Sequence, residues 1–432
     1  MKNKPVFIIS CPFNTYSGYG ARARDIVQSI IDLDKYNVQL LSQKWGNTPT
    51  GFCKDNKEWE HLLALTIQGV RQDQKPDIWM QITIPNEFTR VGKYNIGCTA
   101  GIESTGCQHT WIEGINRMDM TWTSSKHSKQ VFENMKFEGR DPNTNRVTGT
   151  ILKVTKPIHV VFEGVKNDVY KHLPSKEVEL DLSAIPDSFC YLFVGHWMQG
   201  ALGHDRKNVG EMVKIFFETF KGKKNRPALL LKASNGKNSY MSREQILDKI
   251  HQIKGVVGDH DLPNVYILNG ALSDKQMNEL YNHPKCKAMI SFTKGEGFGR
   301  PLAEWCLSKK PLIVSGWSGH MDFIEPEYSV VLGGKLENVD ASAANQWLMK
   351  ETQWFRVDYG QAKKALKDVY DNYKKFTVGG KRQGHFIKEN YSYDKMKELV
   401  GNILDANLPE FAKEIKLNLP NITAPKLNIP KV

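Results

Sequence analysis

The order of short apolar runs along this chain most constrains its fold. These runs alternate with helical stretches, which is typical of a parallel sheet covered by helices on both faces. They fall into two sets: Val6–Ser10, Val38–Ser42, Asp77–Thr83, Tyr94–Ala100, Met120–Ser125 and His159–Gly164, then Phe189–Gly195, Ala228–Lys232, Val265–Asn269, Ala288–Phe292, Leu312–Ser315 and Ser329–Leu332. Two sets predict an α/β protein with two Rossmann-like domains. A chain of 432 residues is long enough for two cores.

A polar stretch at residues 167–186 separates the two sets and predicts a linker. The N-terminal domain then spans residues 1–166 and the C-terminal domain residues 187–380. Helical patterns at Gly360–Phe376 and Tyr393–Leu404 follow the second set. We expect a ligand to lie in the cleft between the domains, where α/β sheets present the carboxyl ends of their strands.

Several protein classes are disfavoured by the composition. The sequence has no apolar run of membrane-spanning length, and the apolar part of the N-terminus, Val6–Cys11, is too short for a secretory signal. The seven cysteines are odd in number and scattered without C-x-x-C spacing, which argues against a disulfide framework and a zinc site. These features predict a cytoplasmic protein without integral membrane contact.

The segment Gly295–Glu304, sequence GEGFGRPLAE, carries two carboxylates eight positions apart. It follows a buried strand, and Pro301 suits the first turn of a helix, so the predicted unit is strand, glycine loop and helix N-terminus. Unpaired amides at a helix start favour a phosphate, and glycines let a ligand approach the backbone. Glu296 and Glu304 would then lie on opposite sides of that phosphate.

This E-G-F-G-x-P-x-x-E frame, with PLIVSGWSGHMDF at residues 311–323, resembles the donor-site signature of the retaining, GT-B-fold glycosyltransferases of family 4. The resemblance implies two Rossmann-like domains that face each other across a cleft. It implies an acceptor-side N-terminal domain, a nucleotide-sugar-binding C-terminal domain and a helix, residues 381–405, that returns to the N-terminal domain. Glu296 is the expected catalytic group on the sugar hydroxyls. Glu304 would hold the ribose, beside a donor loop of Gly297, Phe298 and Gly299.

The loop after the first strand contains Gly18 and Gly20, ahead of an amphipathic stretch at Ala23–Ile31. These glycines permit a tight turn whose amides face the cleft. A Gly-x-Gly pair is also a common simple turn, and the third glycine of a dinucleotide-binding motif is absent. The loop resembles the glycine loop that family members place beside the donor, so Gly18 and Gly20 are donor-binding candidates.

Arg206 and Lys207 precede a predicted helix at Val209–Phe220. Two cations oppose the dipole of a helix start, so we expect the donor diphosphate between them and the amides. A solvated basic pair is the alternative. Family members carry Arg directly after the preceding strand glycine, where this chain has His196. Lys232, at the end of an apolar strand, is a further donor-binding candidate that points either into the cleft or to water.

The loop after the strand at Tyr94–Ala100 resembles the acceptor-side loop of the family. Glu103 and His109 in it are candidates for binding the reacting hydroxyl, or for structural roles. Two D-x-D sequences, at Asp32 and at Asp259, fall in polar turns and do not predict a metal site. Cations and helix ends are then left to neutralise a leaving diphosphate.

The acceptor is indicated only indirectly. A net charge of +12, from 59 Lys and Arg against 47 Asp and Glu, attracts polyanions, but the lysines are dispersed and also suit a solubilising surface. A repeated Lys-Leu-Asn-x-Pro motif in residues 406–432 predicts a Pro-rich extended tail. The tail, the Ser17–Gly20 loop and the compact length resemble phage-encoded members of the family.

Three functional hypotheses follow. The first is a retaining, metal-independent glycosyltransferase that moves a sugar from a UDP-, GDP- or ADP-linked donor to a hydroxyl of a 5-hydroxymethylated pyrimidine in duplex DNA. The second is the same transfer to a glycan, lipid or protein. The third is a non-catalytic protein that binds nucleotide sugars, against which the intact pair Glu296 and Glu304 argues. The residues do not name the sugar, the nucleobase or the oligomeric state.

Overall fold

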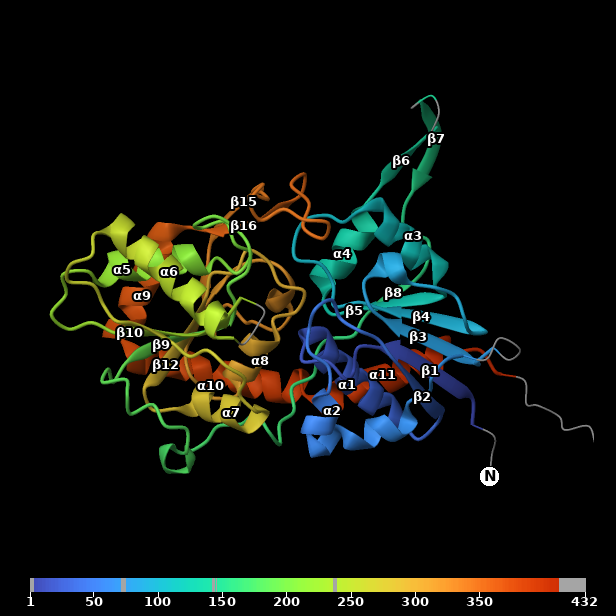
Figure 1. The fold of residues 1–432 in the computed structure, drawn as a ribbon, viewed down its shortest axis with the longest axis horizontal. Helices are drawn as coiled ribbons and strands as arrows, with labels where there is room; N and C mark the ends of the chain where they lie inside the picture. The colour runs from blue at the N-terminus through green and yellow to red at the C-terminus, as the bar shows by residue number, and fades with distance from the viewer. Residues whose placement is uncertain (1–3, 71–74, 142–143, 145, 236–238, 412–432) are drawn as a thin grey trace, which may run out of the picture.

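The computed structural model describes residues 4–70, 75–141, 144, 146–235 and 239–411. Two domains are visible side by side, each built around a six-stranded parallel sheet (Figure 1). The N-terminal sheet has the order β2 (Asn37–Ser42), β1 (Val6–Cys11), β3 (Ile78–Ile82), β4 (Tyr94–Cys98), β5 (Met120–Thr123) and β8 (Ile158–Val160). The C-terminal sheet has the order β11 (Val265–Ile267), β10 (Ala228–Ser234), β9 (Cys190–His196), β12 (Cys286–Ser291), β13 (Leu312–Ser315) and β14 (Val330–Leu332).

The strand sequences explain why these sheets form. All five residues of β3 and all four of β5 and β13 are buried, as expected for strands covered on both faces. The strand order reverses between β1 and β3 and again between β9 and β12. Ligands of such sheets bind outside the carboxyl ends of the strands at these switch points. The loops after β1, β9 and β12 are therefore the ones that this topology brings to the cleft.

Helices cover the sheets of both domains. The N-terminal domain has α1 (Gly18–Asp32), α2 (Phe52–Asp55), α3 (His109–Arg117), α4 (Lys126–Asn134) and the 3₁₀ turns η1 (Lys57–Leu65) and η2 (Pro85–Glu87). The C-terminal domain has α5 (Val209–Phe220), α6 (Tyr240–Val257), α7 (Asp274–Asn282), α8 (Arg300–Cys306), α9 (Tyr359–Asp371) and η4 (Gly319–Asp322). The connection between the domains carries η3 (Ser175–Glu177). None of the described helices is long and apolar enough to cross a membrane.

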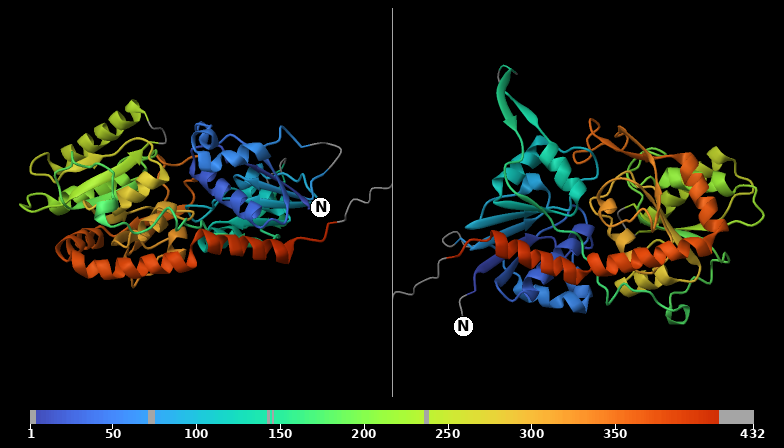
Figure 2. Two further views of the ribbon diagram at one scale, coloured as in Figure 1. Left: turned by 90° about the horizontal axis from the view of Figure 1, so that it is seen from below. Right: turned by 180° about the vertical axis from the view of Figure 1, so that it is seen from behind.

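The last two helices, α10 (Tyr373–Asn390) and α11 (Tyr393–Asn407), run along the back of both domains (Figure 2). Helix α11 packs on α1, and its residues Met396, Val400 and Leu404 belong to the N-terminal core. Where the chain returns, Tyr393 N donates to Val165 O at 2.8 Å, so both crossings between the domains lie side by side. The C-terminal end of the described chain thus ties the two domains together.

The structure corrects several expectations about the elements. Helix α1 begins at Gly18, so Gly18 and Gly20 lie in its first turn and not in a preceding loop. The predicted helices Gly360–Phe376 and 381–405 are three helices, α9, α10 and α11. Two antiparallel hairpins were not predicted: β6 (Phe137–Arg140) with β7 (Val147–Leu152), which projects from the N-terminal domain, and β15 (Gly334–Asn338) with β16 (Gln353–Val357) (Figure 1). The repeated tail motif lies outside the described residues.

Candidate active site

The donor loop connects β12 to the short helix α8 in the C-terminal domain. Gly299 adopts a φ of 98° just before α8, a conformation that favours glycine. Glu296 is fixed at both ends of its peptide, because its N–H donates to Ser318 Oγ at 2.9 Å and its carbonyl accepts from Gly319 N at 3.0 Å. Phe298 is buried, with its ring centroid 4.8 Å from that of Phe323. The loop is therefore held rigidly, with Glu296 at its apex.

Two glycines of this loop touch the other domain. A Cβ atom at Gly295 would lie 1.9 Å from Glu103 O, and one at Gly297 would lie 2.3 Å from Ala100 O. The Ser124 hydroxyl of the N-terminal domain lies 3.0 Å from Gly297 O. We expected these glycines to admit a ligand to the backbone. In the structure they admit the backbone of the facing domain, so the motif is also a contact between domains.

Glu296 is buried among cations. Its carboxylate contacts Lys207 Nζ directly and lies 3.6 Å from Arg206 Nη1. Burial alone would raise the pKa of Glu296, but Lys207 and Arg206 outweigh it and hold the pKa at about 2. Glu296 is therefore ionised at neutral pH. Arg206 also lies 3.7 Å from Glu103, so the structure brings this acceptor-side carboxylate to the same cluster.

The loop between β9 and α5 positions the two cations. Asp205 is fully buried and accepts hydrogen bonds from Val209 N at 3.0 Å and Gly210 N at 3.4 Å, so it satisfies amides at the start of α5. We expected an anionic ligand to resolve the conflict between the cations and this helix start. The chain's own Asp205 bonds to amides of this helix start, and a diphosphate beside the two cations stays a prediction. Arg206 and Lys207 thus turn away from their own helix and towards Glu296.

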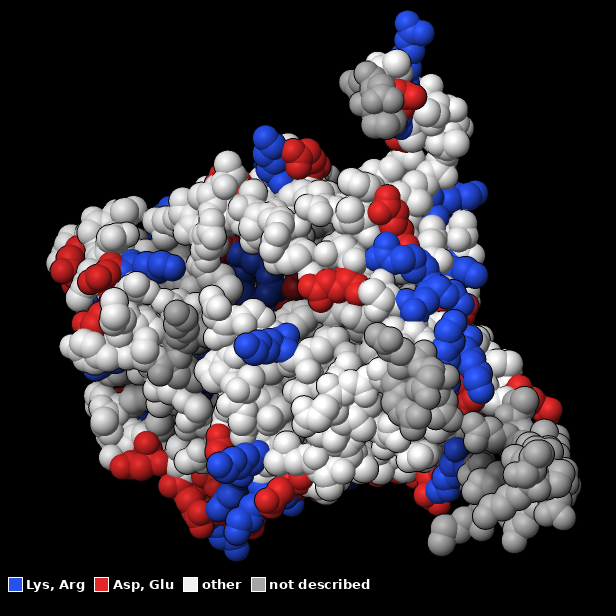
Figure 3. All heavy atoms as spheres, turned by 45° about the vertical axis from the view of Figure 1, so that its right-hand side comes forward, with Lys and Arg blue, Asp and Glu red and all other residues white. Residues whose placement is uncertain are grey.

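Further basic groups lie at the same edge of the sheet. Lys232 on β10 donates to Gly270 O at 2.6 Å. The pKa of His196, at the end of β9, is lowered to about 4 by burial and by the charges of Lys207, Arg206 and Lys232. These three cations are therefore close enough to act on one imidazole. Figure 3 shows a recess in which basic side chains lie deep, with an acidic side chain beside its opening.

Glu304 lies on α8 and is buried. It accepts from Arg300 Nε at 2.9 Å and from the Tyr281 hydroxyl at 3.1 Å. Burial raises the pKa of Glu304 to about 7, although Arg300 opposes this shift. Arg300 also donates to Asp25 of α1 at 2.7 Å, across the domain interface. Sequence reasoning missed Asp25, because no local pattern in α1 indicates a partner 275 residues away.

The remaining candidates divide between the cleft and the surface. Gly20 is packed against the Thr15 backbone, whereas a Cβ atom at Gly18 would have no described atom within 4 Å.

His109 is exposed at the first residue of α3, where its ring packs edge-on against Phe137. This position does not join His109 to the cluster around Glu296, and we assign it no part in the chemistry. Asp32 contacts Tyr393 at the end of α1, and the described residues hold no group of His, Cys, Asp and Glu side chains arranged for a metal ion.

Comparison with solved structures places this arrangement in a fold class. No protein-family model matches the chain, and no curated protein has a detectably similar sequence. HepE from Anabaena, solved with UDP and glucose, matches with a TM-score of 0.58 and 12% identity over 93% of this chain and 100% of that chain. A glycosyltransferase from Rickettsia africae matches with a TM-score of 0.61 and 14% identity, over 94% of this chain and 99% of that chain. Sucrose-phosphate synthase from Thermosynechococcus elongatus matches with a TM-score of 0.60 and 10% identity, over 93% of this chain and 98% of that chain.

At this level of identity the likeness concerns the fold. The chain has the GT-B fold, with two Rossmann-like domains and a parallel sheet in each, and the predicted fold class is confirmed. The structural neighbours are GT-B glycosyltransferases, and one of them, HepE, was solved with UDP and with UDP-glucose.

Proposed function

We propose that this protein is a retaining, metal-independent glycosyltransferase of family 4 that uses a nucleotide-diphosphate sugar. The observation that carries the proposal is the ionised Glu296, held by Lys207 and Arg206 at the point where the donor loop meets the facing domain. A buried, rigid carboxylate beside two cations can bind sugar hydroxyls while the cations face a diphosphate. UDP is the preferred nucleotide on the strength of the neighbours solved with it, ahead of GDP and ADP.

The proposed chemistry assigns each group a task. Lys207, Arg206, Lys232 and the Gly297–Arg300 loop bind the diphosphate, and Glu304 binds the ribose. The bond between the anomeric carbon and the phosphate oxygen breaks, and the acceptor oxygen bonds to the same face of that carbon. The acceptor proton passes to the leaving phosphate. The cations stabilise the charge that develops on the diphosphate, which is electrostatic catalysis without a metal ion.

A hydroxymethylated pyrimidine in phage DNA is the acceptor that we favour, with the reaction in the host cytoplasm. The hairpin of β6 and β7 supports this choice. The hairpin with one residue on each side, residues 136–153, contains four Lys and Arg against two Asp and Glu. Figure 3 shows basic side chains at the tip of the hairpin and in a group on the domain below it. A projecting hairpin with Lys136 and Lys153 at its base could contact the phosphate backbone of a duplex from the N-terminal domain. A glycan, lipid or protein acceptor is the alternative.

A transfer assay with labelled UDP-glucose tests the proposal. The acceptors are duplex DNA with 5-hydroxymethylcytosine, the same duplex unmodified, and a bacterial envelope fraction. We expect label only in the hydroxymethylated duplex, with the anomeric configuration of the donor retained by NMR. Label in the envelope fraction alone would move the function to a glycan or lipid acceptor. If UDP, GDP and ADP at millimolar concentration all fail to raise the melting temperature, the result would argue against nucleotide-sugar transfer to either kind of acceptor.

A further inference from the structure

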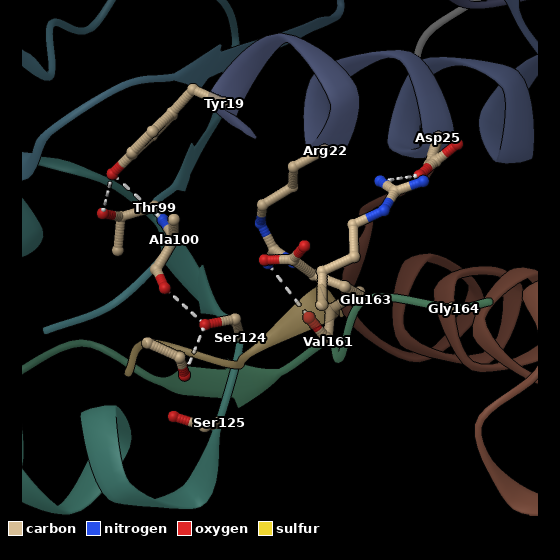
Figure 4. Close-up of polar contacts among 12 residues, drawn as sticks. Tyr19, Arg22, Asp25, Thr99, Ala100, Ser124, Ser125, Val161, Glu163 and Gly164 are labelled. Atoms are coloured by element: carbon tan, nitrogen blue, oxygen red, sulfur yellow. Dashed lines mark hydrogen bonds and ion pairs between the residues drawn. The ribbon is translucent and has the colours of Figure 1, made fainter. Parts of the chain in front are cut away.

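Arg22, on the second turn of α1, is an incompletely bonded buried cation. Its side chain is 1% exposed, and Nη2 donates to Val161 O at 3.0 Å. Nε and Nη1 make no hydrogen bond of good geometry among the described residues, although Arg22 lies close enough to the Cys98 thiol to lower, through a hydrogen bond, the pKa that burial raises. The nearest carboxylate, Glu163, lies 3.9 Å from Nη1, which is too far for a hydrogen bond. Figure 4 shows the two side chains pointing towards each other.

Buried donors without partners are rare, because each one loses its bonds to water. Arg24, two positions further along the same helix, shows the usual solution. Its side chain is also buried, and its Nη1 donates to Phe13 O at 2.8 Å and Thr15 O at 3.0 Å. Arg22 thus differs from its neighbour because its buried guanidinium is not fully bonded by protein oxygen atoms and lies beside a carboxylate.

Residues drawn with Arg22 in Figure 4 contact the loop to which we assign the donor. Ser124, which follows β5, contacts both Ala100 O and the donor-loop carbonyl of Gly297. The Tyr19 hydroxyl bonds to Thr99 at 3.0 Å and Ala100 N at 3.1 Å (Figure 4). Thr99 and Ala100 follow β4, Ser124 follows β5, and Val161 and Glu163 follow β8, whereas Tyr19 lies in the first turn of α1. They form the acceptor-side wall opposite the donor loop.

Glu163 also responds to the donor side electrostatically. Burial raises its pKa, Arg22 and Arg300 lower it, and the negative charges of Asp25 and Glu296 raise it again. Glu163 therefore lies within electrostatic reach of the carboxylate to which we assign the sugar.

We propose that Arg22 and Glu163 form the acceptor-binding subsite, which takes a neutral ring that presents a hydrogen-bond donor beside a hydrogen-bond acceptor. The guanidinium donates to the acceptor atom of the ring, and the carboxylate accepts from its donor. The ligand is neutral because the pair already balances its own charge, and an added anion would face Glu163. This inference rests on the proposed function.

Two sources offer this chemistry. One is the edge of a cytosine flipped from DNA, whose amino group donates to a carboxylate while the adjacent ring nitrogen accepts. The other is a pair of neighbouring sugar hydroxyls. Duplex DNA with 5-hydroxymethylcytosine and methyl α-glucoside, each offered with UDP-glucose, distinguish them.

The test compares Arg22→Gln and Glu163→Gln with the matched control Arg24→Gln. We expect each of the first two to raise KM for the acceptor that the wild type uses by about tenfold or more, as for a missing hydrogen bond to a charged group. The dissociation constant of UDP, from calorimetry, should stay within about twofold. Arg24→Gln should lower the melting temperature without a change in acceptor KM. Glu163→Gln remains decisive if Arg22→Gln does not fold.

Unchanged acceptor KM in Glu163→Gln, or an equal loss of UDP and acceptor affinity, would overturn the subsite. Either result would leave the proposed function intact, because the wild type would still bind UDP and transfer sugar. A wild type that binds no nucleotide and modifies neither acceptor would instead overturn the proposed function.

Discussion

At the scale of single residues, Glu296 carries the proposed chemistry. Replacing Glu296 with Gln keeps its shape and removes its charge. We expect turnover to fall by about 10²–10³, as when one preorganised electrostatic partner is removed, with UDP affinity nearly kept. The measurements are kcat with labelled donor and UDP binding by calorimetry.

Glu337→Gln is the matched control for this prediction. It removes a carboxylate from Lys294, which is buried two positions before Glu296, at an ion-pair distance of 2.6 Å. We expect it to lower stability but to reduce turnover far less. If Glu296→Gln instead weakened UDP binding and kept turnover, the roles of Glu296 and Glu304 would be exchanged.

The pKa of Glu304 predicts that protein stability and UDP affinity both depend on pH. Its pKa is raised by burial from 4.5 to about 7, so the folded protein binds a proton that the unfolded chain has released. The contribution of this group to stability is therefore complete below pH 4.5 and is lost as the pH rises through 7. In the proposed donor site, a ribose hydroxyl donates to the ionised carboxylate of Glu304. UDP affinity should thus increase between about pH 6 and pH 8, by up to about tenfold per unit below the pKa.

Calorimetric titrations with UDP across this range provide the measurement. Glu304→Gln serves as the control, because it retains the titration of the diphosphate itself and lacks that of the carboxylate. We expect a flatter pH profile in this variant. Parallel profiles in the two proteins would contradict contact between Glu304 and the ribose.

At the scale of elements, the loop between β12 and α8 contacts the N-terminal domain so closely that we expect Gly297 not to tolerate a side chain. A Cβ atom at Gly297 would meet the Ala100 carbonyl oxygen, which is backbone and cannot move aside cheaply. Gly297→Ala should therefore push the domains apart at the site and reduce kcat by a large factor. Gly255→Ala, on α6 with no described atom near the added methyl group, should be neutral or stabilise the helix by about 0.5–1 kcal/mol. Retention of wild-type kcat in Gly297→Ala would contradict this.

The elements also separate what local sequence can predict from what it cannot. The strands of both sheets follow from apolar runs, because burial on both faces requires them. The donor loop followed from its glycines and Pro301. The hairpin of β6 and β7 lacks such a signal, since β7 is almost entirely exposed. The pairing of Lys207 with Glu296 and of Arg300 with Asp25 arises from tertiary contacts over 89 and 275 positions, which no local pattern encodes.

The proposed DNA acceptor makes a prediction for the hairpin of β6 and β7. Among the described residues, β6 and β7 pair only with each other, so truncation of the hairpin should leave both six-stranded sheets intact. Replacement of the exposed Lys136, Arg146 and Lys153 with Ala should weaken binding of duplex DNA. It should also reduce the slope of log affinity against log salt by about 0.9 for each phosphate that is no longer neutralised. Fluorescence anisotropy at several salt concentrations measures both.

The control for the hairpin variant replaces Lys364, Lys367 and Lys374 on α9 and α10, which removes the same charge from the other domain. If both triple variants lower the slope equally, net charge rather than the hairpin attracts DNA. An unchanged slope in the hairpin variant would remove the hairpin from the DNA-binding surface.

At the scale of the whole molecule, the two domains are held in contact by polar groups at the cleft. Arg300 bonds to Asp25 at 2.7 Å, and Lys126 N donates to Asp322 at 2.7 Å. Arg300 contacts Glu304 as well, so the proposed ribose site and the domain contact share one guanidinium. If Glu304 binds the ribose as proposed, we expect donor binding and the contact between the domains to be linked, because both involve Arg300.

Asp25→Asn tests this linkage. The carboxylate is 4% exposed and the guanidinium 19% exposed, so removal of the negative charge leaves Arg300 poorly compensated and favours separation of the domains. We expect a larger radius of gyration by small-angle X-ray scattering without ligand, partly reversed by UDP, and a weaker UDP affinity. Asp34→Asn, which breaks the exposed pair with Lys4 in the same domain, should change neither quantity. If Asp25→Asn keeps the wild-type radius and UDP affinity, Arg300 acts on Glu304 alone and closure does not depend on this bridge.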